Sequence, residues 1–425
     1  MLPSTKFSSR PVVSIGWSES PSRETLGVKP GQLARSLFMR ALASPARRRV
    51  MRQGAELRRR MTGAPHRVEY FHQVDDPYSQ LAAQALAPLL HRYAIELTPH
   101  LVAAPDDAAT PERELLTDFA RRDAADIAPH YGLVFRDPGR RPAPELVRRA
   151  QSILAGALAS AQFGTLAARV GAALWASDAA ALDRIASESA PADESDTTLH
   201  LQEGTQRRSA LGHYLGATFH YGDEWYWGID RLGHLEERLL ALEAVRAEGA
   251  ERRFTPPPET CGARDASRVT LEFFPSLRSP YSYLAMPRVT DLARRTGVRL
   301  VLRPVLPMVM RGLPVPRRKA MYIVMDVARE AERLELPFGH AVDPVGRPVE
   351  RAYSPFQWAR ERGKADELLL AFARGAFAEA IDTGTHAGIR KVVEHAGLDF
   401  AEARKVLDGG PGAPSSSRIG WPYMP

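Results

Sequence analysis

The chain has almost no cysteine, since Cys261 is the only one among 425 residues. A single cysteine excludes an intramolecular disulfide and a C-x-x-C redox pair, so dithiol redox chemistry is not open to this chain. No apolar run reaches the length of a membrane span, and the first residues lack the pattern of a secretory signal. We therefore expect a cytoplasmic protein with no membrane contact.

The composition is that of a globular protein with more than one domain. Hydrophobic residues make up 44% and charged residues 25% of the chain, which are ordinary values for globular proteins. A length of 425 residues is enough for two domains that each bury a sizeable core. No cluster of cysteine and histidine has the spacing of a zinc site, so we expect no metal.

Positive charge is concentrated at the start of the chain. The formal net charge is +7, and residues 1–64 hold thirteen Lys and Arg against three Glu. A helical pattern from Gln32 to Met61, broken at Pro45, carries most of this charge. We interpret it as a solvated basic helix, because one basic face without interleaved aromatic residues is weak evidence for nucleic-acid binding. A contact with nucleic acid or an anionic surface stays open as the alternative.

The most informative pattern is a short segment that occurs twice. A strand pattern at 68–71 and a helix start at 76–82 recur at 271–274 and 279–285, at a constant offset of 203 residues. In each copy a capping residue, a proline and a tyrosine open the helix. Two related halves are therefore expected.

The order of elements is similar in the two halves. Each half predicts strand, helix and strand, followed by a helical block, which is Ala-rich over 111–187 in the first half. The first half then adds a hairpin, with strands at 217–221 and 225–228, and a closing helix. After Asp408 too few residues follow for a hairpin and a helix, so either the chain is truncated there or its tail replaces the missing strands.

We therefore predict an α/β fold with two tandem thioredoxin-like domains, each with a helical insertion, the second truncated at its C-terminus. The parallel strands of each half would be joined by a right-handed crossover. The expected divisions are a disordered segment 1–31, a basic helical arm 32–64, a degenerate thioredoxin-like domain 65–248, a linker 249–267, a DsbA-like domain 268–408 and an irregular tail 409–425.

Two motifs of the second half resemble a known family. One is Val269–Phe274 with Ser279–Ala285, and the other runs from Lys319 to Arg329, preceded by Arg303-Pro304 and followed by 336–338. Together they resemble the 2-hydroxychromene-2-carboxylate isomerases and kappa-class glutathione transferases of the DsbA-like thioredoxin superfamily. The first half is similar more loosely, in its opening and at 225–232.

The resemblance implies glutathione as cofactor or substrate. A serine at the start of the first helix hydrogen-bonds the thiolate in such enzymes, and that serine matches Ser279. Helix N-termini carry partial positive charge and free N–H groups, which favour a thiolate. Arg278 would add positive potential, Lys319 would meet a carboxylate, and Tyr281 lies in the same motif as a further cofactor contact. The thiolate would add to an unsaturated substrate and leave after bond rotation.

Structural interpretations of the same residues stay open. Ser279 followed by proline is also an ordinary helix cap, and Asp326 with Arg329 is also a helical ion pair. Asp76 caps a helix as well as serine does, but its carboxylate would repel a thiolate, so the first half is expected to be silent. Pro275 replaces an aspartate of the family, and Ala217 stands where its cis-proline belongs, so the grip on glutathione is expected to be lost in the first half.

Two functions from different classes follow. The leading hypothesis is a glutathione-dependent isomerase or transferase that acts on a small aromatic or unsaturated acid, with Ser279 as the catalytic residue. The alternative is a non-catalytic binding or scaffold protein in which one half supports the other. We expect a small-molecule substrate and no nucleic-acid partner, and homodimer formation stays open.

Overall fold

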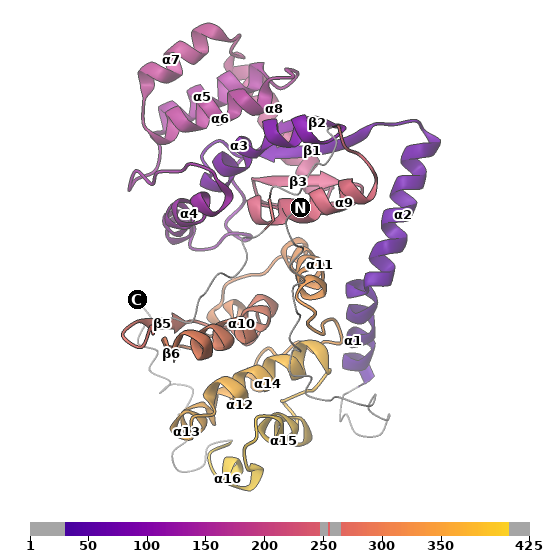
Figure 1. Cartoon of the computed structure of the whole chain (residues 1–425), viewed down its shortest axis with the longest axis vertical. Coiled ribbons are helices and arrows are strands. Elements are labelled where there is room, and N and C mark those ends of the chain that lie inside the picture. Colours follow the sequence, from indigo (N-terminus) through magenta and orange to yellow (C-terminus); the bar gives the residue numbers. More distant parts are fainter. Residues whose placement is uncertain (1–29, 247–253, 256–264, 408–425) are drawn as a thin grey trace, which may run out of the picture.

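The computed structural model describes residues 30–246, 254–255 and 265–407 (Figure 1). Cys261, nearly all of the segment expected to be disordered, most of the expected linker and the tail lie outside the described residues. In the described part, no helix combines the length and the apolar character that a bilayer crossing requires.

A two-helix arm precedes the first strand. Helix α1 spans Pro30–Ala43 and helix α2 spans Pro45–Met61. The break falls at Ser44, as predicted, because Pro45 has no N–H to continue the first helix and the Ser44 side chain accepts a hydrogen bond from the backbone N of Arg47. The arm runs along the side of both halves of the molecule (Figure 1).

The first half is built on a four-stranded sheet in the order β2-β1-β3-β4. Strands β1 (His66–His72) and β2 (Ile95–Leu101) are parallel and are joined by helix α3 (Pro77–Arg92). Strands β3 (Thr218–Tyr221) and β4 (Glu224–Trp227) form an antiparallel hairpin, and β3 pairs with β1. The hairpin therefore completes the sheet that the strand–helix–strand unit begins.

The turn of this hairpin lies where the sequence predicts it. Gly222 and Asp223 both have positive φ, 50° and 65°. Two successive residues with positive φ make the turn whose twist matches that of the flanking strands, and glycine and aspartate tolerate this conformation well. The backbone preference of two residues thus sets the register, with Tyr221 opposite Glu224.

In the sequence, a block of helices lies between strands β2 and β3 of this sheet. The Ala-rich stretch predicted as helical over 111–187 is divided into several helices and extends further than predicted, to Ala210. These helices are α4 (Arg113–Ile127), η1 (Ala128–Tyr131), α5 (Pro144–Gly156), α6 (Phe163–Trp175), α7 (Ala179–Glu188) and α8 (Glu194–Ala210). After the hairpin, η2 (Ile229–Arg231) and α9 (Leu232–Ala241) close the half.

The second half has the same opening but a smaller sheet. Strands β5 (Thr270–Phe273) and β6 (Arg299–Leu302) are parallel and are joined by α10 (Pro280–Thr296). Within residues 265–407 no further strand follows β6, as the sequence predicts. The rest is helical, namely η3 (Met308–Arg311), α11 (Arg317–Arg333), α12 (Arg347–Tyr353), α13 (Phe356–Glu361), α14 (Ala365–Ala378), α15 (His386–His395) and α16 (Phe400–Arg404).

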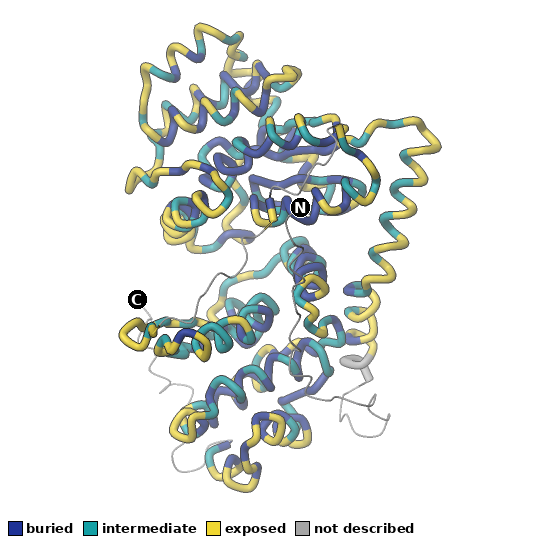
Figure 2. Tube along the Cα trace, in the orientation of Figure 1, coloured by how far each residue is buried: buried dark blue, intermediate teal, exposed yellow. Residues whose placement is uncertain are grey.

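Each half has its own hydrophobic core. In the first half Tyr70 and Leu86 belong to a cluster between the sheet and the helical block. In the second half Leu284 of α10 and Phe372 of α14 belong to a separate cluster. The buried segments in Figure 2 follow this division, and helix α11 is buried at every position over 326–331. Contacts between the halves are therefore formed by surfaces outside both cores.

Two helical glycines give opposite predictions for the same substitution. A Cβ at Gly204 of α8 would lie 2.0 Å from the carbonyl oxygen of Leu101, whereas a Cβ at Gly54 of α2 would meet nothing within 4 Å. We expect Gly204→Ala to lower the free energy of unfolding by about 1–3 kcal/mol, because backbone must move. The matched Gly54→Ala should raise it by about 0.5–1 kcal/mol. Urea unfolding of both variants measures this, and equal effects would contradict the packing of α8 on β2.

Candidate functional site

Ser279 is the N-cap of helix α10. Its backbone is extended and its Oγ accepts a hydrogen bond from the backbone N of Ser282, with Pro280 at the first helical position. The N···O distance is 3.4 Å, which is long for such a bond. Ser279 is half-buried. The capping role is therefore confirmed, and it leaves the hydroxyl hydrogen free to be donated to another group.

Asp76 occupies the equivalent position at the start of α3. Its carboxylate accepts hydrogen bonds from the backbone N of Ser79 at 3.0 Å, from the Ser79 hydroxyl at 2.8 Å and from the backbone N of Tyr78 at 3.3 Å. A Cβ at Gly216 would lie 3.2 Å from Asp76 Oδ2, so the backbone before β3 lies against this cap. Burial raises the pKa of Asp76 to about 6. At neutral pH the first cap is therefore a carboxylate that only accepts hydrogen bonds.

The loop before β3 has the conformation of a strained turn. Ala217 has a φ of 52°, a region that favours glycine over residues with a Cβ. Its carbonyl oxygen accepts a hydrogen bond from the backbone N of Gly228, which fixes the loop to the end of the hairpin. The first-half cap is thus covered by a rigid segment, and among residues 265–407 no strand follows β6 to carry an equivalent segment.

The two cations predicted around Ser279 are held by other groups. Arg278 donates to both carboxylate oxygens of Asp343, at 2.7 and 2.8 Å. Lys319, at the start of α11, donates from Nζ to the carbonyl oxygen of Ala109 in the first half at 2.9 Å. Burial lowers the pKa of Lys319. No hydrogen bond or ion pair of the described residues joins Ser279 to either cation.

The Tyr281 hydroxyl, predicted as a cofactor contact, donates to Asp326 Oδ2 of α11 at 2.8 Å. The first half contains the same bond, from the Tyr78 hydroxyl to Asp123 Oδ2 of α4 at 2.7 Å. Both members of the pair are displaced by 203 residues, the offset of the repeated segment. The similarity of the two halves therefore extends from the first helix into the helical block. Sequence analysis missed Asp123, although the constant offset from Asp326 would have identified it.

Asp326 connects the two halves of the molecule. Arg231, in η2 of the first half, donates to Asp326 through Nε at 3.0 Å and through a terminal nitrogen at 2.9 Å. Arg329 donates to Asp326 Oδ1, the oxygen that also accepts from Arg231 Nε, at 2.8 Å, and the Asp326 side chain has no exposed surface. Burial by itself raises the pKa of Asp326, but Arg231 and Arg329 outweigh it and hold this pKa below its ordinary value. At neutral pH Asp326 is therefore an ionised carboxylate that links the two halves.

Further contacts of α11 reinforce this link. Arg329 also donates to the carbonyl oxygen of Trp225 at 3.1 Å and lies over the ring of Tyr226, 4.6 Å from its centroid. Glu330, one helical turn after Asp326, pairs with His234 of α9. Burial opposes ionisation of Glu330, yet the hydrogen bond from His234 and the charge of Arg231 leave its pKa well below the ordinary value. The helical ion pair of Asp326 with Arg329 is present as predicted from residue spacing, and Lys319, Asp326 and Arg329 all contact the first half.

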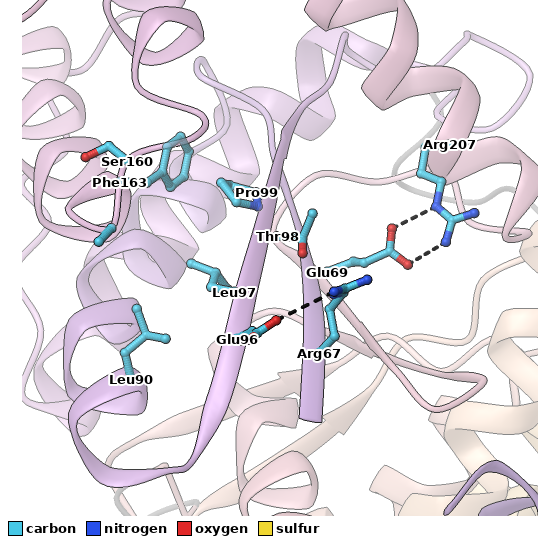
Figure 3. A pocket seen from close by; sticks show the side chains of 11 residues that line it. Arg67, Glu69, Leu90, Glu96, Leu97, Thr98, Pro99, Ser160, Phe163 and Arg207 are labelled. Carbon is cyan, nitrogen blue, oxygen red and sulfur yellow. Dashed lines mark hydrogen bonds and ion pairs between the residues drawn. The ribbon is translucent and has the colours of Figure 1, made fainter. Parts of the chain in front are cut away.

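A hollow of about 550 Å³ lies at the free edge of β2 (Figure 3). Side chains of β2 and of the neighbouring strand β1 surround it, with Leu97 of β2 on one side and Glu69 of β1 on the other. Arg207 binds the Glu69 carboxylate through two bonds of 2.7 Å, and Arg67 pairs with Glu96. The charged groups that line the hollow pair with one another. None of the residues predicted to bind glutathione lines it.

Removal of the Asp326 carboxylate tests its role in joining the halves. Asp326→Ala should lower the free energy of unfolding by about 3–5 kcal/mol, because Arg231 and Arg329 would stay buried without their anion. Arg67→Gln, which breaks an exposed ion pair, should change it by less than about 1 kcal/mol. Guanidinium unfolding measures both. Similar losses in the two variants would show that the Asp326 cluster does not hold the halves together.

The raised pKa of Asp76 predicts a pH-dependent stability. The folded-state pKa of about 6 exceeds the unfolded value of about 3.9, so the folded protein binds this proton more tightly. The contribution of Asp76 to stability is full below pH of about 4 and is lost as the pH rises through about 6. Asp76→Asn should therefore gain stability relative to the unmodified protein over this window. Ser279→Asn is the control, because it changes a cap that has no carboxyl group, and its difference in free energy of unfolding from the unmodified protein should not depend on pH. A difference for Asp76→Asn that stays constant with pH would contradict the prediction.

Comparisons with known proteins give a family match for the C-terminal part of the chain and matches to solved structures. No curated protein matches the chain. A solved structure of selenomethionine-containing 2-hydroxychromene-2-carboxylate isomerase matches with 22% identity and a TM-score of 0.30, over 41% of this chain and 95% of that one. A score this low carries no argument about this chain. Residues 270–413 match the family of DSBA-like thioredoxin domains, so the C-terminal part of the chain carries a DsbA-like thioredoxin domain.

Proposed function

We propose that the second half binds glutathione at the start of α10 and uses its thiolate as the nucleophile of an isomerase or transferase. The substrate would be a small aromatic or unsaturated acid. In the isomerase reaction the thiolate sulfur forms a bond to an unsaturated carbon as the π bond of that carbon breaks and its electron pair moves onto the conjugated acceptor. The former double bond then rotates as a single bond, and the π bond forms again as the carbon–sulfur bond breaks. The thiolate is released unchanged, so no oxidant or reductant is consumed.

The observation that carries this proposal is the weakly engaged hydroxyl of Ser279. Its Oγ accepts one long bond from the Ser282 backbone, and its hydrogen is free to be donated to a thiolate. The N-terminus of α10 adds partial positive charge at the same point. Hydrogen bonds to a charged group are the strong ones. Both effects would lower the pKa of a bound thiol and increase the fraction of glutathione present as the nucleophilic thiolate.

The first half would take no part in the chemistry. Asp76 is ionised at neutral pH and would repel a thiolate, and Gly216 lies against it. We infer that the halves arose by tandem duplication, supported by the Tyr78–Asp123 and Tyr281–Asp326 hydrogen bonds at one offset. In this proposal the first half supports the second through α11.

Arg278 and Lys319 are proposed cofactor contacts that would exchange partners on binding. Arg278 would leave Asp343, a half-exposed carboxylate, for a carboxylate of glutathione. Lys319 would leave one backbone carbonyl, and a carboxylate is the stronger partner for an ammonium group. Tyr281 would act indirectly, since its hydroxyl is bound to Asp326 and fixes the start of α10 against α11.

A non-catalytic scaffold is the second candidate, and one observation favours it. Lys319, Asp326 and Arg329 all contact the first half. The face of α11 on which the resemblance places a ligand contact, at Lys319, therefore serves an interface between the halves. In a scaffold, Ser279 would be a helix cap and nothing more. The two candidates therefore differ in what the loss of the Ser279 hydroxyl does to glutathione.

A glutathione titration of the full chain separates these candidates. We expect binding by calorimetry, and the ultraviolet absorbance of the bound thiolate should appear below the ordinary thiol pKa of about 8.5. Ser279→Ala should weaken binding about tenfold or more and return the thiol pKa toward its ordinary value, because a hydrogen bond to a charged group is lost. Asp76→Ala, the matched cap in the other half, should leave both unchanged. Absence of glutathione binding would overturn the proposal and favour the scaffold.

A further inference from the structure

A cavity of about 400 Å³ lies between the arm and the two halves. Its walls come from α2, from the end of α8, from the β3–β4 hairpin and from α11, which lies between the arm and the first half (Figure 1). This volume falls within the range of small-molecule sites, about 300–1,000 Å³. None of the residues predicted around glutathione lines it. We call it the arm cavity.

The apolar wall of the arm cavity is soft and partly aromatic. Met51 of α2, Met321 and Met325 of α11, and Trp225 of the hairpin line it. Methionine side chains are flexible and polarizable, so they adapt to ligands of different outline and make favourable contacts with aromatic rings. Such a wall suits a flat or extended apolar body.

The charged groups of the arm cavity leave a positive excess. The three acids that line it are already engaged, because Glu224 binds Arg52 through two bonds, Asp326 binds two arginines and Asp223 pairs with Arg58. Arg47 also lines the cavity and has no ion-pair partner among the described residues. Arg48 pairs with Glu332, and its side chain is only 14% exposed. A ligand entering here therefore meets cationic groups that favour an anion.

The buried hydroxyl of Tyr322 is the second sign of a ligand. Tyr322 lines the arm cavity and is 6% exposed, and its Oη has no hydrogen-bond partner in the described part of the protein. Buried tyrosine hydroxyl groups ordinarily find a partner, and an unmade bond at a buried polar atom is costly. The Nε of Arg329, on the same wall, also lacks a partner. By contrast, no residue that lines the hollow at β2 has a buried atom of this kind.

We propose that the arm cavity is a binding site for a small amphipathic anion, a carboxylate or sulfonate with an aromatic or alkyl body. The acid group would lie near Arg47 and Arg48, the apolar body against the three methionines, and a polar atom within reach of Tyr322. Because the walls belong to the arm and to both halves, an occupied cavity would hold these parts together. Binding to the native state alone raises apparent stability. The inference does not depend on the proposed glutathione site.

Calorimetry with 1-naphthoate and with decanoate tests the site on the full chain. At least one of the two should bind with one-to-one stoichiometry, while neutral 1-naphthalenemethanol should bind more weakly than 1-naphthoate. Excess glutathione should not displace the anion. Absence of binding by both anions would overturn the proposal, and so would equal binding of the neutral analogue or displacement by glutathione.

Three variants localise the binding. Tyr322→Phe should weaken anion binding by about 3- to 10-fold without lowering thermal stability, because the hydroxyl makes no hydrogen bond in the free protein. Arg47→Gln should weaken it and reduce its dependence on salt. Met325→Trp should block it by filling the cavity. Arg67→Gln, at the distant β2 edge, is the control and should bind normally. Unchanged binding in Met325→Trp would place the anion elsewhere and overturn the assignment.

Discussion

The carboxylate of Asp326 is the group on which the arrangement of the two halves depends. It is buried between Arg231 of the first half and Arg329 of its own helix, and it also accepts the Tyr281 hydroxyl. A buried charge is tolerated only when its hydrogen bonds are complete, and here both oxygens are satisfied by groups from three elements. The cluster fixes the rotation of α11 about its axis. That rotation in turn decides what Lys319 and Tyr322 face, and it positions the start of α10 through Tyr281.

The caps of α3 and α10 differ in one residue, Asp76 against Ser279, and this difference changes which groups each cap can bind. Both residues accept hydrogen bonds from their own helix, so both open it equally well. Asp76 offers only acceptors at neutral pH and lies under the Gly216 backbone, whereas Ser279 keeps a hydrogen to donate. The first half has the four-stranded sheet, and the second half has the cap that we propose to bind a thiolate.

The basic arm, which the sequence predicts as a solvated helix, pairs its cations with acids of both halves. Arg52 and Arg58 pair with Glu224 and Asp223 of the hairpin, and Arg48 pairs with Glu332 of α11. These cations are used to hold α2 across both halves, although α2 has no buried residue of its own. The arm therefore closes one side of a cavity that neither half would form alone. Among the described cations that line this cavity, Arg47 is the one without an ion-pair partner, and it is the basis for assigning the cavity to an anion.

The sequence by itself determined the local elements. The break at Pro45, the turn at Gly222-Asp223 and the caps at Asp76 and Ser279 follow from backbone preferences and bonds that span a few residues. It also indicated that Asp326 and Arg329 would pair, since they lie three positions apart on one helix. Only the tertiary structure decided that Asp326 binds Arg231, 95 positions away, and that Lys319 reaches the Ala109 carbonyl, 210 positions away. The reason is physical: periodicity defines which residues share a helix face, but packing of distant surfaces decides what that face meets.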